Sequence, residues 1–416
     1  MKRRTFLKTL CMSVPVLTCL DTFKALATTE YNKVKITDVK CMRMFPGARV
    51  KPWVRIETDA GITGYGECHH ERDGEGAKDV VLNHLKRVLV GQDPLDIEKL
   101  TFQMMRGVSY YGAHGGITVH AVTGTESALW DLAGKILGVP TRKIIGGGTH
   151  VDKVPAMRTG GPRNRTDKAA LRDWAARVKE DPSGIKIYKM DIQRSQRWER
   201  PNNLQLSYED LKRNIQGFEN IREAVGDDIE IGVHCHWEFN FIDALNLARG
   251  LAPMRPKWLE DPLPIEFNEQ WVKLTEQSPV PILTGENLYT RADFEPFIMK
   301  QGCHMINIDI TMAGGLLEAK KISDLADLYY IPITAHNVAS NLGTIQSAQC
   351  AATMREFYAH ETFGTAGWGG SPDIIIYDRE LLKDGYIQLN DKPGAGFEIN
   401  PDVAKQYLCE GEQWWD

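Results

Sequence analysis

From about residue 151 onward, one pattern repeats along the chain: a short apolar run, an ionisable residue and then an amphipathic stretch. The ionisable residues recur every 23 to 27 residues and are His234, Glu260, Glu286, Asp309, His336 and Glu361. A strand of about five residues, a helix of about ten to twelve and two short loops take up about 25 residues. Strands and helices that alternate in this way form a parallel sheet with right-handed crossovers, and about eight units close a barrel. The repeat therefore predicts an α/β fold, a TIM-like (β/α) barrel.

Each of these ionisable residues stands at the end of its predicted strand. Barrels of this kind place their active sites at the carboxyl ends of the strands. Residues of this type from consecutive units would therefore line one cavity. The alternative is that they are strand ends that face the solvent, but chance alternation accounts for one or two such positions and not for the whole set. We expect one polar site at this end of the barrel.

The part ahead of the barrel has a different pattern. Residues 34 to about 72 alternate apolar and polar side chains, with a hairpin turn at Asp59-Ala60-Gly61. Between residues 129 and 137 the apolar side chains follow helical spacing, and Gly138 closes that helix. We expect an N-terminal α+β domain over residues 28–150, the barrel over 151–385, and a C-terminal segment over 386–416 that returns to the first domain.

The first 27 residues are expected to lie outside the fold. Arg3-Arg4 stands ahead of Phe6-Leu7-Lys8, an apolar run follows, and Ala25-Leu26-Ala27 offers a small-x-small cleavage site. This order resembles a twin-arginine export signal, which predicts a periplasmic mature protein. The alternatives are an inert basic N-terminus and a lipoprotein anchored at Cys19, for which Thr18 is a poor preceding residue.

Charge narrows the choice of partner. The whole chain carries a net charge of −5, and removal of residues 1–27 leaves 45 Lys and Arg against 54 Asp and Glu, a net charge of −9. An acidic body argues against nucleic acid or an anionic membrane as a partner. No apolar run after the N-terminus approaches the roughly 20 residues that a membrane span needs. We therefore expect no nucleic-acid partner and no membrane span.

Five motifs, each weak alone, are specific when taken together. They are DAGITGYGE at residues 59–67, ESALWDLAGK at 126–135, WLEDP at 258–262, TGE at 284–286 and DITMAGG at 309–315. They resemble the enolase superfamily, in its mandelate racemase and acid-sugar dehydratase branch, and the resemblance covers nearly the whole mature chain. It implies a modified (β/α) barrel with an N-terminal α+β capping domain, and a homo-oligomeric enzyme.

The resemblance also implies a metal site. In that family, acidic residues at the ends of the third, fourth and fifth barrel strands hold one Mg²⁺, which stabilises the enediolate formed when the α-proton of a carboxylate substrate leaves. Glu260 and Glu286 match the fourth and fifth positions, and His234 stands at the third, where the family usually has Asp. A nitrogen ligand shifts the preference of a site from Mg²⁺ toward Mn²⁺, Fe²⁺ or Zn²⁺. The alternative is that His234 faces the substrate, or lies behind the ligands, instead of binding the metal.

Proton-transfer residues are implied on opposite sides of the barrel. Lys189, at the end of the second predicted strand, matches the catalytic lysine of the family. His336 and Asp309 resemble its His-Asp dyad, in which the carboxylate fixes the imidazole tautomer and raises its basicity. Glu361 matches the acid on the eighth strand that hydrogen-bonds the substrate carboxylate.

Three further residues are candidates for the site. His236 matches a histidine that some sugar-acid dehydratases of the family use as an acid, and residues i and i+2 of a strand share a face, so His234 and His236 are both expected in the cavity. Arg158 ends the first predicted strand and is a candidate substrate contact. His69 follows a capping strand and is a second candidate substrate contact across the barrel mouth.

These residues, with the roles that the resemblance implies for them, predict a metal-dependent lyase that dehydrates a sugar acid. One flank removes the proton α to the carboxylate, and loss of the 3-hydroxyl as water gives a 2-keto-3-deoxy acid. A racemase, an epimerase or a cycloisomerase uses the same enediolate and remains an alternative. A further alternative, of another class, is a non-catalytic sugar-acid binding protein that lost its metal when the third-strand Asp became His234.

Overall fold

The computed structural model describes most of the chain beyond residue 33. The described residues are 34–47, 49–69, 73–108, 110–147, 152–193, 205–237, 239–363 and 372–415. The predicted export signal, residues 1–27, lies outside them. Among the described residues, no helix has both the length and the apolar character that a membrane crossing requires.

The N-terminal part begins with a three-stranded antiparallel sheet in the order β1-β2-β3. Its strands are β1 (Ile36–Met44), β2 (Lys51–Thr58) and β3 (Thr63–Glu67). Gly61 has a φ of 72° in the turn between β2 and β3, a conformation that glycine adopts at no steric cost. The predicted hairpin is therefore confirmed.

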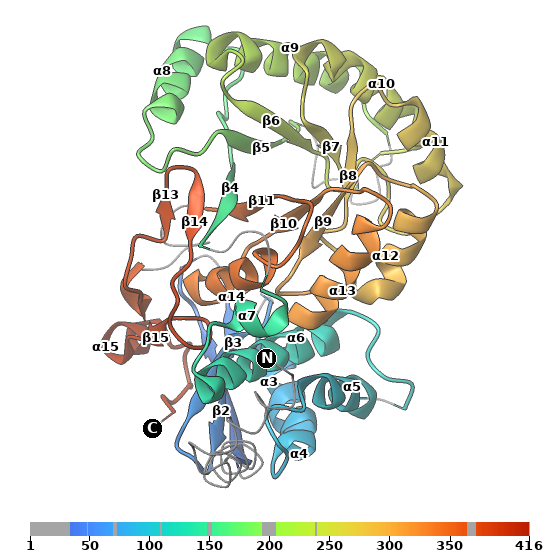
Figure 1. Ribbon diagram of the computed structural model, residues 1–416. Coiled ribbons are helices and arrows are strands. Elements are labelled where there is room, and N and C mark those ends of the chain that lie inside the picture. The colour runs from blue at the N-terminus through green and yellow to red at the C-terminus, as the bar shows by residue number, and fades with distance from the viewer. Residues whose placement is uncertain are drawn as a thin grey trace, which may run out of the picture.

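The helices that follow this sheet pack against it and against one another (Figure 1). They are α3 (Glu75–Val80), which continues through a π-helical turn (Val81–Leu85) into α4 (Lys86–Leu89), then α5 (Ile97–Gly107), α6 (Gly116–Leu137) and α7 (Thr141–Ile145). The helix predicted over 129–137 is the end of the longer α6, and Gly138 ends it with a φ of 70°. A Cβ on Gly66 would lie 2.0 Å from the Gly124 carbonyl oxygen, so β3 contacts α6 at a distance that only glycine allows.

The second part is a closed barrel of eight parallel strands. The strands are β4 (Lys153–Thr159), β5 (Ile187–Asp191), β6 (Glu230–His234), β7 (Trp258–Glu260), β8 (Ile282–Thr284), β9 (Met305–Asp309), β10 (Ile333–His336) and β11 (Phe357–Thr362). They neighbour one another in chain order, and β11 pairs with β4 to close the ring. The predicted parallel barrel with an antiparallel capping sheet is confirmed.

One helix follows each strand but the last. These helices are α8 (Lys168–Lys179), α9 (Tyr208–Val225), α10 (Phe241–Leu251), α11 (Glu269–Gln277), α12 (Thr290–Met299), α13 (Leu316–Asp327) and α14 (Asn341–Ala351). A short 3₁₀ turn (Ala252–Met254) extends α10. In Figure 1 the helices surround the strands and the capping elements lie below the barrel.

The strand ends agree closely with the positions of the ionisable repeat. Four strands end on the predicted residue: His234, Glu260, Asp309 and His336. Glu286 lies two residues beyond β8, and Glu361 is the penultimate residue of β11. Parallel strands in one barrel end on the same side, so these side chains gather at one mouth.

The C-terminal part first extends the barrel sheet and then returns to the capping domain. Its elements are the 3₁₀ turn Pro372–Ile374, β12 (Ile375–Ile376), β13 (Leu382–Lys383), β14 (Tyr386–Gln388), β15 (Glu398–Ile399), α15 (Pro401–Ala404) and a 3₁₀ turn (Lys405–Tyr407). Strand β14 pairs antiparallel with β4. Farther on, the Ala395 amide donates to Asp131 of α6 (2.8 Å), and Arg43 of β1 pairs with Glu412 (2.7 Å).

The capping domain docks on the barrel through a buried carboxylate. Glu126 of α6 accepts hydrogen bonds from the Leu316 and Leu317 amides at the start of α13 (2.8 and 3.1 Å). Free amides at a helix N-terminus favour a carboxylate. A Cβ on Gly315 would lie 2.5 Å from this carboxyl group, so glycine is required there. Because α13 follows the strand that ends in Asp309, this contact ties the capping domain to a predicted catalytic element.

The floor of the barrel mouth is a tryptophan. Trp258 lies inside the barrel and is fully buried, and its indole Nε1 donates to Glu260 Oε2 (3.0 Å). A Cβ on Gly232 of the neighbouring strand would approach the indole ring to 2.4 Å. Strand β6 therefore lies flat against this ring only because residue 232 has no side chain.

Candidate active site

All the predicted site residues except Arg158 lie in one connected network at the barrel mouth. The charged members of its centre are Lys189, His234, Glu260, Glu286 and Glu361, and each is at most 7% exposed. Buried charges are costly unless they are paired. The strands therefore enclose a group of mutually paired charges.

Lys189 lies among three carboxylates. Its Nζ is 3.0 Å from Glu260 Oε1, 3.2 Å from Glu361 Oε2 and 3.3 Å from Glu286 Oε2. Burial alone would lower the pKa of Lys189, but the carboxylates of Glu260, Glu361 and Glu286 outweigh it and hold the pKa well above its ordinary value. Lys189 is therefore a fixed positive charge in this arrangement.

His234 faces the same carboxylates from β6. Its Nε2 lies 3.5 Å from both Asp261 Oδ2 and Glu286 Oε2, and 3.9 Å from Glu260 Oε1. Ligand atoms from these four residues all lie within 4.8 Å of one another. Within the part of the chain that the structure describes, His234 Nε2 and Asp261 Oδ2 are buried without a hydrogen-bond partner. Such a convergence of buried, unsatisfied ligand atoms fits a divalent cation.

Asp261 was not predicted as a site residue. It follows Glu260 directly and has a φ of 47°, in the left-handed region, which turns its carboxylate toward His234. Its other oxygen accepts a hydrogen bond from Thr284 Oγ1 (2.6 Å). The only sequence signal was the acidic pair in the WLEDP motif, since adjacent strand residues normally face opposite sides.

Burial and neighbouring charges shift the pKa values of the residues in this cluster in different directions. Burial raises the pKa of Glu260, against the opposing charges of Lys189 and His234. Burial would also raise the pKa of Glu286, but His234, His336 and Lys189 together lower it well below its ordinary value. Burial would lower the pKa of His234, yet the carboxylates of Glu286 and Glu260 hold it well above the ordinary value. The cluster thus attracts positive charge strongly.

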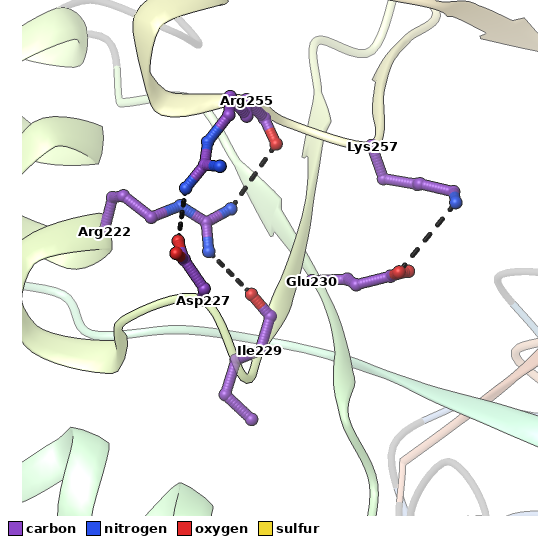
Figure 2. Close-up of a pocket in the computed structure, with 6 residues that line it drawn as sticks. All are labelled: Arg222, Asp227, Ile229, Glu230, Arg255 and Lys257. Carbon is purple, nitrogen blue, oxygen red and sulfur yellow. Dashed lines mark hydrogen bonds and ion pairs between the residues drawn. The ribbon is translucent and has the colours of Figure 1, made fainter.

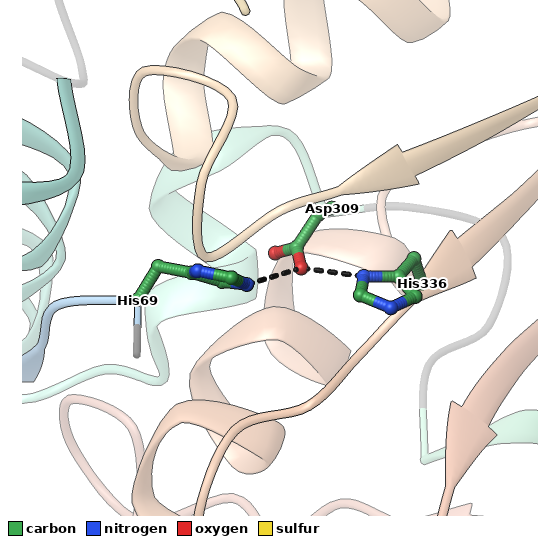
Figure 3. A group of neighbouring side chains, drawn as sticks. All are labelled: His69, Asp309 and His336. Carbon is green, nitrogen blue, oxygen red and sulfur yellow. Dashed lines mark hydrogen bonds and ion pairs between the residues drawn. The ribbon is translucent and has the colours of Figure 1, made fainter. Parts of the chain in front are cut away.

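The opposite flank of the mouth holds the expected His-Asp pair. His336 Nδ1 lies 2.6 Å from Asp309 Oδ2, and Figure 3 shows the two side chains reaching toward each other from neighbouring strands. The Thr311 amide and hydroxyl bind the other Asp309 oxygen (2.9 and 2.7 Å). His336 Nε2 points into the cluster, 3.8 Å from Glu286 and 3.9 Å from Glu361. The carboxylate thus orients the ring so that its Nε2 faces the site.

The pKa values of this pair are shifted in opposite directions. Burial would lower the pKa of His336, but Glu286, Glu361 and Asp309 outweigh it and raise the pKa to about 9. Burial would raise the pKa of Asp309, but His69 and His336 hold it well below its ordinary value. Asp309 is therefore a permanent carboxylate, as a group that orients a base must be.

His69 contacts Asp309 from the capping domain. Its Nε2 is 3.2 Å from the same Oδ2 that binds His336, so one oxygen joins both rings (Figure 3). The ring of His69 also packs on His120, with centroids 4.9 Å apart, and His120 Nε2 bonds Tyr289 Oη (3.1 Å). His69 was predicted as a substrate contact. The structure places it behind the Asp309 carboxylate, a position that does not favour contact with a substrate. Its role in substrate binding stays a prediction.

His236 reaches the site for a different reason than expected. Strand β6 ends at His234, and His236 has a φ of 60°, so the argument from two residues on one strand face is wrong. The chain turns after the strand, and the His236 ring stacks on His234 with centroids 3.7 Å apart and an interplanar angle of 27°. The two rings are adjacent all the same, and the acid role of His236 stays a prediction.

Arg158 is not brought to the cluster. Its neighbours Met157 and Thr159 face the barrel interior, where Thr159 bonds Glu361, so Arg158 points to the opposite face of β4. There it pairs with Asp181 in the segment before β5. The predicted substrate contact finds no support in this position.

A separate surface hollow lies away from the mouth. It has a volume of about 230 Å³ and is lined by Arg222, Asp227, Ile229, Glu230, Arg255 and Lys257 (Figure 2). Glu230 is the first residue of β6, whereas His234 is the last, so the hollow lies at the amino ends of the strands. Its charges are largely paired with one another, as Arg255 with Asp227 and Lys257 with Glu230. It contains none of the predicted site residues.

Comparison with known families assigns both parts of the chain. Residues 170–403 match the model described as enolase C-terminal domain-like, and residues 48–146 match the N-terminal domain of mandelate racemase / muconate lactonizing enzyme. The chain belongs to the mandelate racemase and muconate lactonizing enzyme family of the enolase superfamily. The predicted resemblance is thus confirmed, and the protein is an enzyme of this superfamily by descent.

Several relatives of this chain are named as dehydratases of sugar acids. A D-xylonate dehydratase from Haloferax volcanii is 32% identical over 88% of this chain and 87% of its own. A D-galactonate dehydratase from Xanthomonas campestris is 30% identical over 87% of this chain and 92% of its own. A crystal structure of a mandelate racemase/muconate lactonizing enzyme-like protein from Rubrobacter xylanophilus is 28% identical, with a TM-score of 0.82 over 91% of this chain and 98% of that one.

Members of this family typically depend on a metal, and the four-residue cluster at His234, Glu260, Asp261 and Glu286 is a candidate for it. One imidazole among carboxylates is a mixed ligand set. Such a set suits Mn²⁺, Fe²⁺ or Zn²⁺ better than an all-oxygen set does, while Mg²⁺ prefers oxygen. The residues present therefore fit a divalent cation, and its identity stays a prediction.

Proposed function

We propose that this enzyme is a metal-dependent dehydratase of a sugar acid, a hydro-lyase that forms a 2-keto-3-deoxy acid. The observation that carries the proposal is the pair of ionisable flanks, Lys189 on one side and His336 with Asp309 on the other, which both adjoin Glu286 and Glu361. The relatives that dehydrate D-xylonate and D-galactonate support the class of reaction.

The metal would be held by His234, Glu260 and Glu286, with Asp261 beside them. Such a cation supplies Lewis-acid stabilisation of negative charge on a substrate carboxylate. Lys189 adds a permanent positive charge next to the same carboxylates, where an anionic substrate group would lie. The chain therefore brings two sources of positive charge to one place, which the weakly acidic α-proton of a carboxylate requires.

The proton steps are assigned from the geometry of the side chains. His336, oriented by Asp309, takes the proton from carbon 2 on Nε2, and the electron pair of that C–H bond passes into the enediolate. His236 gives a proton to the hydroxyl on carbon 3, the C–O bond breaks, and water leaves. Lys189 stays an ammonium throughout, because three carboxylates hold its pKa high. The resulting enol tautomerises to the 2-keto-3-deoxy acid.

A racemase or epimerase is the second candidate, because it uses two ionisable groups on opposite faces of one carbon. Lys189 and His336 enter from β5 and β10, on different sides of the barrel. In that reaction the enediolate is reprotonated and no water leaves. The two functions therefore differ in whether the 3-hydroxyl is retained.

The test is a substrate screen with two readouts. Purified protein with Mn²⁺ or Mg²⁺ is given D-xylonate, D-galactonate, arabinonate and a panel of other aldonic and uronic-derived acids in D₂O. We expect a 2-keto product from at least one acid, and none from Glu286→Gln protein. Exchange of the α-proton without a keto product would establish the racemase or epimerase instead. An empty metal site, with neither product nor exchange on any acid, would favour a non-catalytic binding protein.

We propose also that the protein is exported by the twin-arginine route to the periplasm. The support is Arg3-Arg4 with the small-residue sequence Ala25-Leu26-Ala27. Fractionation of cells that express the full chain tests this. We expect mature protein in the periplasm for the natural sequence. For the Arg3→Lys/Arg4→Lys variant we expect the precursor to stay in the cytoplasm. Natural protein that stays in the cytoplasm, or a variant that reaches the periplasm, contradicts export by this route.

A further inference from the structure

A carboxylate outside the predicted site lies against both histidines of β6. Asp191 is the last residue of β5 and pairs in register with His234, the last residue of β6. Its Oδ1 lies 3.4 Å from His234 Nδ1 and 3.9 Å from His236 Nδ1. Since the rings are stacked, one carboxylate oxygen faces the same nitrogen of both imidazoles.

This contact determines which nitrogen of His234 faces the carboxylate cluster. A carboxylate that accepts a hydrogen bond from Nδ1–H leaves the lone pair of a neutral imidazole on Nε2. His234 Nε2 is the atom that lies 3.5 Å from Asp261 and Glu286 and has no hydrogen-bond partner among the described residues. Asp191 and the carboxylate cluster therefore lie on opposite edges of one ring.

Asp191 is itself held from behind. The guanidinium of Arg165 donates from Nη2 to the Asp191 carbonyl oxygen (2.6 Å), and Arg165 is only 5% exposed. Burial lowers the pKa of Arg165 to about 10, and the nearby charge of Asp191 opposes that shift. The buried Arg165 thus holds the end of β5 in place through its backbone.

We propose that Asp191 is a positioning residue for the metal site: without binding the metal itself, it fixes the ring and the tautomer of His234 so that Nε2 is the ligand atom, and it places one negative charge behind a neutral imidazole that brings none. This inference rests on the proposed metal-binding role of His234. Partners of this kind on metal-binding histidines change metal affinity by about 10- to 100-fold when they are removed.

The first measurement is Mn²⁺ affinity of the full chain, by electron paramagnetic resonance of the free ion, without any substrate. We expect Asp191→Asn to weaken binding by about 10- to 100-fold. The matched control is Asp181→Asn, which removes an Asp that pairs with Arg158 outside the network, and we expect wild-type affinity. An unchanged affinity for Asp191→Asn overturns the proposal.

A second variant separates positioning from general damage to the fold. His234→Asp removes the imidazole that Asp191 is proposed to orient. In the double variant His234→Asp/Asp191→Asn no ring is left for Asp191 to hold, so Asp191→Asn should cost much less Mn²⁺ affinity in this background than in the wild type. We expect the double variant's loss of binding free energy to be clearly smaller than the sum of the two single losses. If its loss is the sum of the two single losses, Asp191 has a structural role only and the proposal fails.

The third readout is the tautomer itself. In Zn²⁺-loaded, ¹⁵N-histidine-labelled protein, we expect a protonated Nδ1 and a metal-bound Nε2 for His234. Metal bound to Nδ1, or two ions per chain with Asp191 and His236 as ligands of the second, contradicts the proposal. Failure of the wild-type chain to bind any divalent ion would instead overturn the proposed function on which this inference rests.

Discussion

The two flanks of the barrel mouth are built in contrasting ways. The Nζ atom of Lys189 lies 3.0 to 3.3 Å from oxygens of three carboxylates, and no single partner determines its position. His336 has one close partner, Asp309 at 2.6 Å, and its free edge stands 3.8 Å or more from Glu286 and Glu361. One flank is held by charge from all sides, and the other is held by a single hydrogen bond from behind.

The contrast indicates different chemical tasks. A lysine whose pKa is held well above its ordinary value does not give up its proton, so it stabilises charge. A histidine oriented by one carboxylate, with its pKa raised to about 9, is a base of moderate strength with an accessible nitrogen. Both flanks adjoin Glu286 and Glu361, so substitutions of these carboxylates should affect both flanks. Substitutions of Lys189 or His336 should instead distinguish the two chemical tasks.

The largest effect is expected from a carboxylate of the candidate metal cluster. Glu260→Gln removes a charge from the candidate metal cluster and an acceptor from Lys189 and Trp258. Loss of the cation removes several kcal/mol of charge stabilisation, so we expect turnover to fall by about 10³-fold or more. Turnover and bound metal are measured together, and a variant that keeps its metal and its activity would show that Glu260 is not a ligand. Glu266→Gln, in the exposed loop after β7, is the control.

The flanks themselves come next. We expect His336→Asn to abolish exchange of the substrate α-proton in D₂O, with turnover lower by about 10²- to 10⁴-fold.

Lys189→Met should lower turnover by a similar factor, yet it frees Glu260 and Glu286 and should therefore bind Mn²⁺ at least as tightly as the wild type. Exchange that survives in His336→Asn but not in Lys189→Met would reverse the assignment of the base.

Much of the barrel mouth could be predicted from the sequence. The apolar runs that end in His234, Glu260, Asp309 and His336 became strands with those ends, because the strand period and the short loops of a barrel leave little freedom. The contact of His69 with Asp309 and the positions of Asp191 and Asp261 were not predictable. They depend on how the capping domain docks, on the register between β5 and β6, and on a left-handed residue after β7, none of which follows from periodicity.

A smaller effect, with a definite sign, is expected at Asp309. As a base His336 must be neutral, so activity rises with pH through its pKa, and we place the ascending limb between the ordinary 6.5 and about 9. Asp309→Asn removes a charge that raises this pKa, so the limb should move to lower pH while the maximal rate falls by about 10²-fold. The pH profile of kcat/KM measures this shift, and a limb that stays in place would mean that another group is the base.

The smallest effect is expected at His69. His69→Phe keeps a ring but removes the 3.2 Å contact between His69 Nε2 and Asp309 Oδ2, which leaves that carboxylate more available to His336. The limb should then move to higher pH, opposite to Asp309→Asn, with a change of about tenfold or less in rate. His120→Phe, whose ring packs on His69 and whose Nε2 bonds Tyr289, is the control. A large rise in KM with no pH shift would instead support the predicted substrate contact.

The absence of a side chain at residue 232 has a consequence for how this site tolerates change. A methyl group there would press on the Trp258 indole, whose Nε1 steadies Glu260 from below. Gly232→Ala would therefore disturb a candidate ligand from the adjoining strand without altering any polar atom, and screens restricted to charged positions would overlook it. Glycine at residue 232 therefore restricts which variants of this enzyme keep Glu260 in place, as the ionisable residues of the site also do.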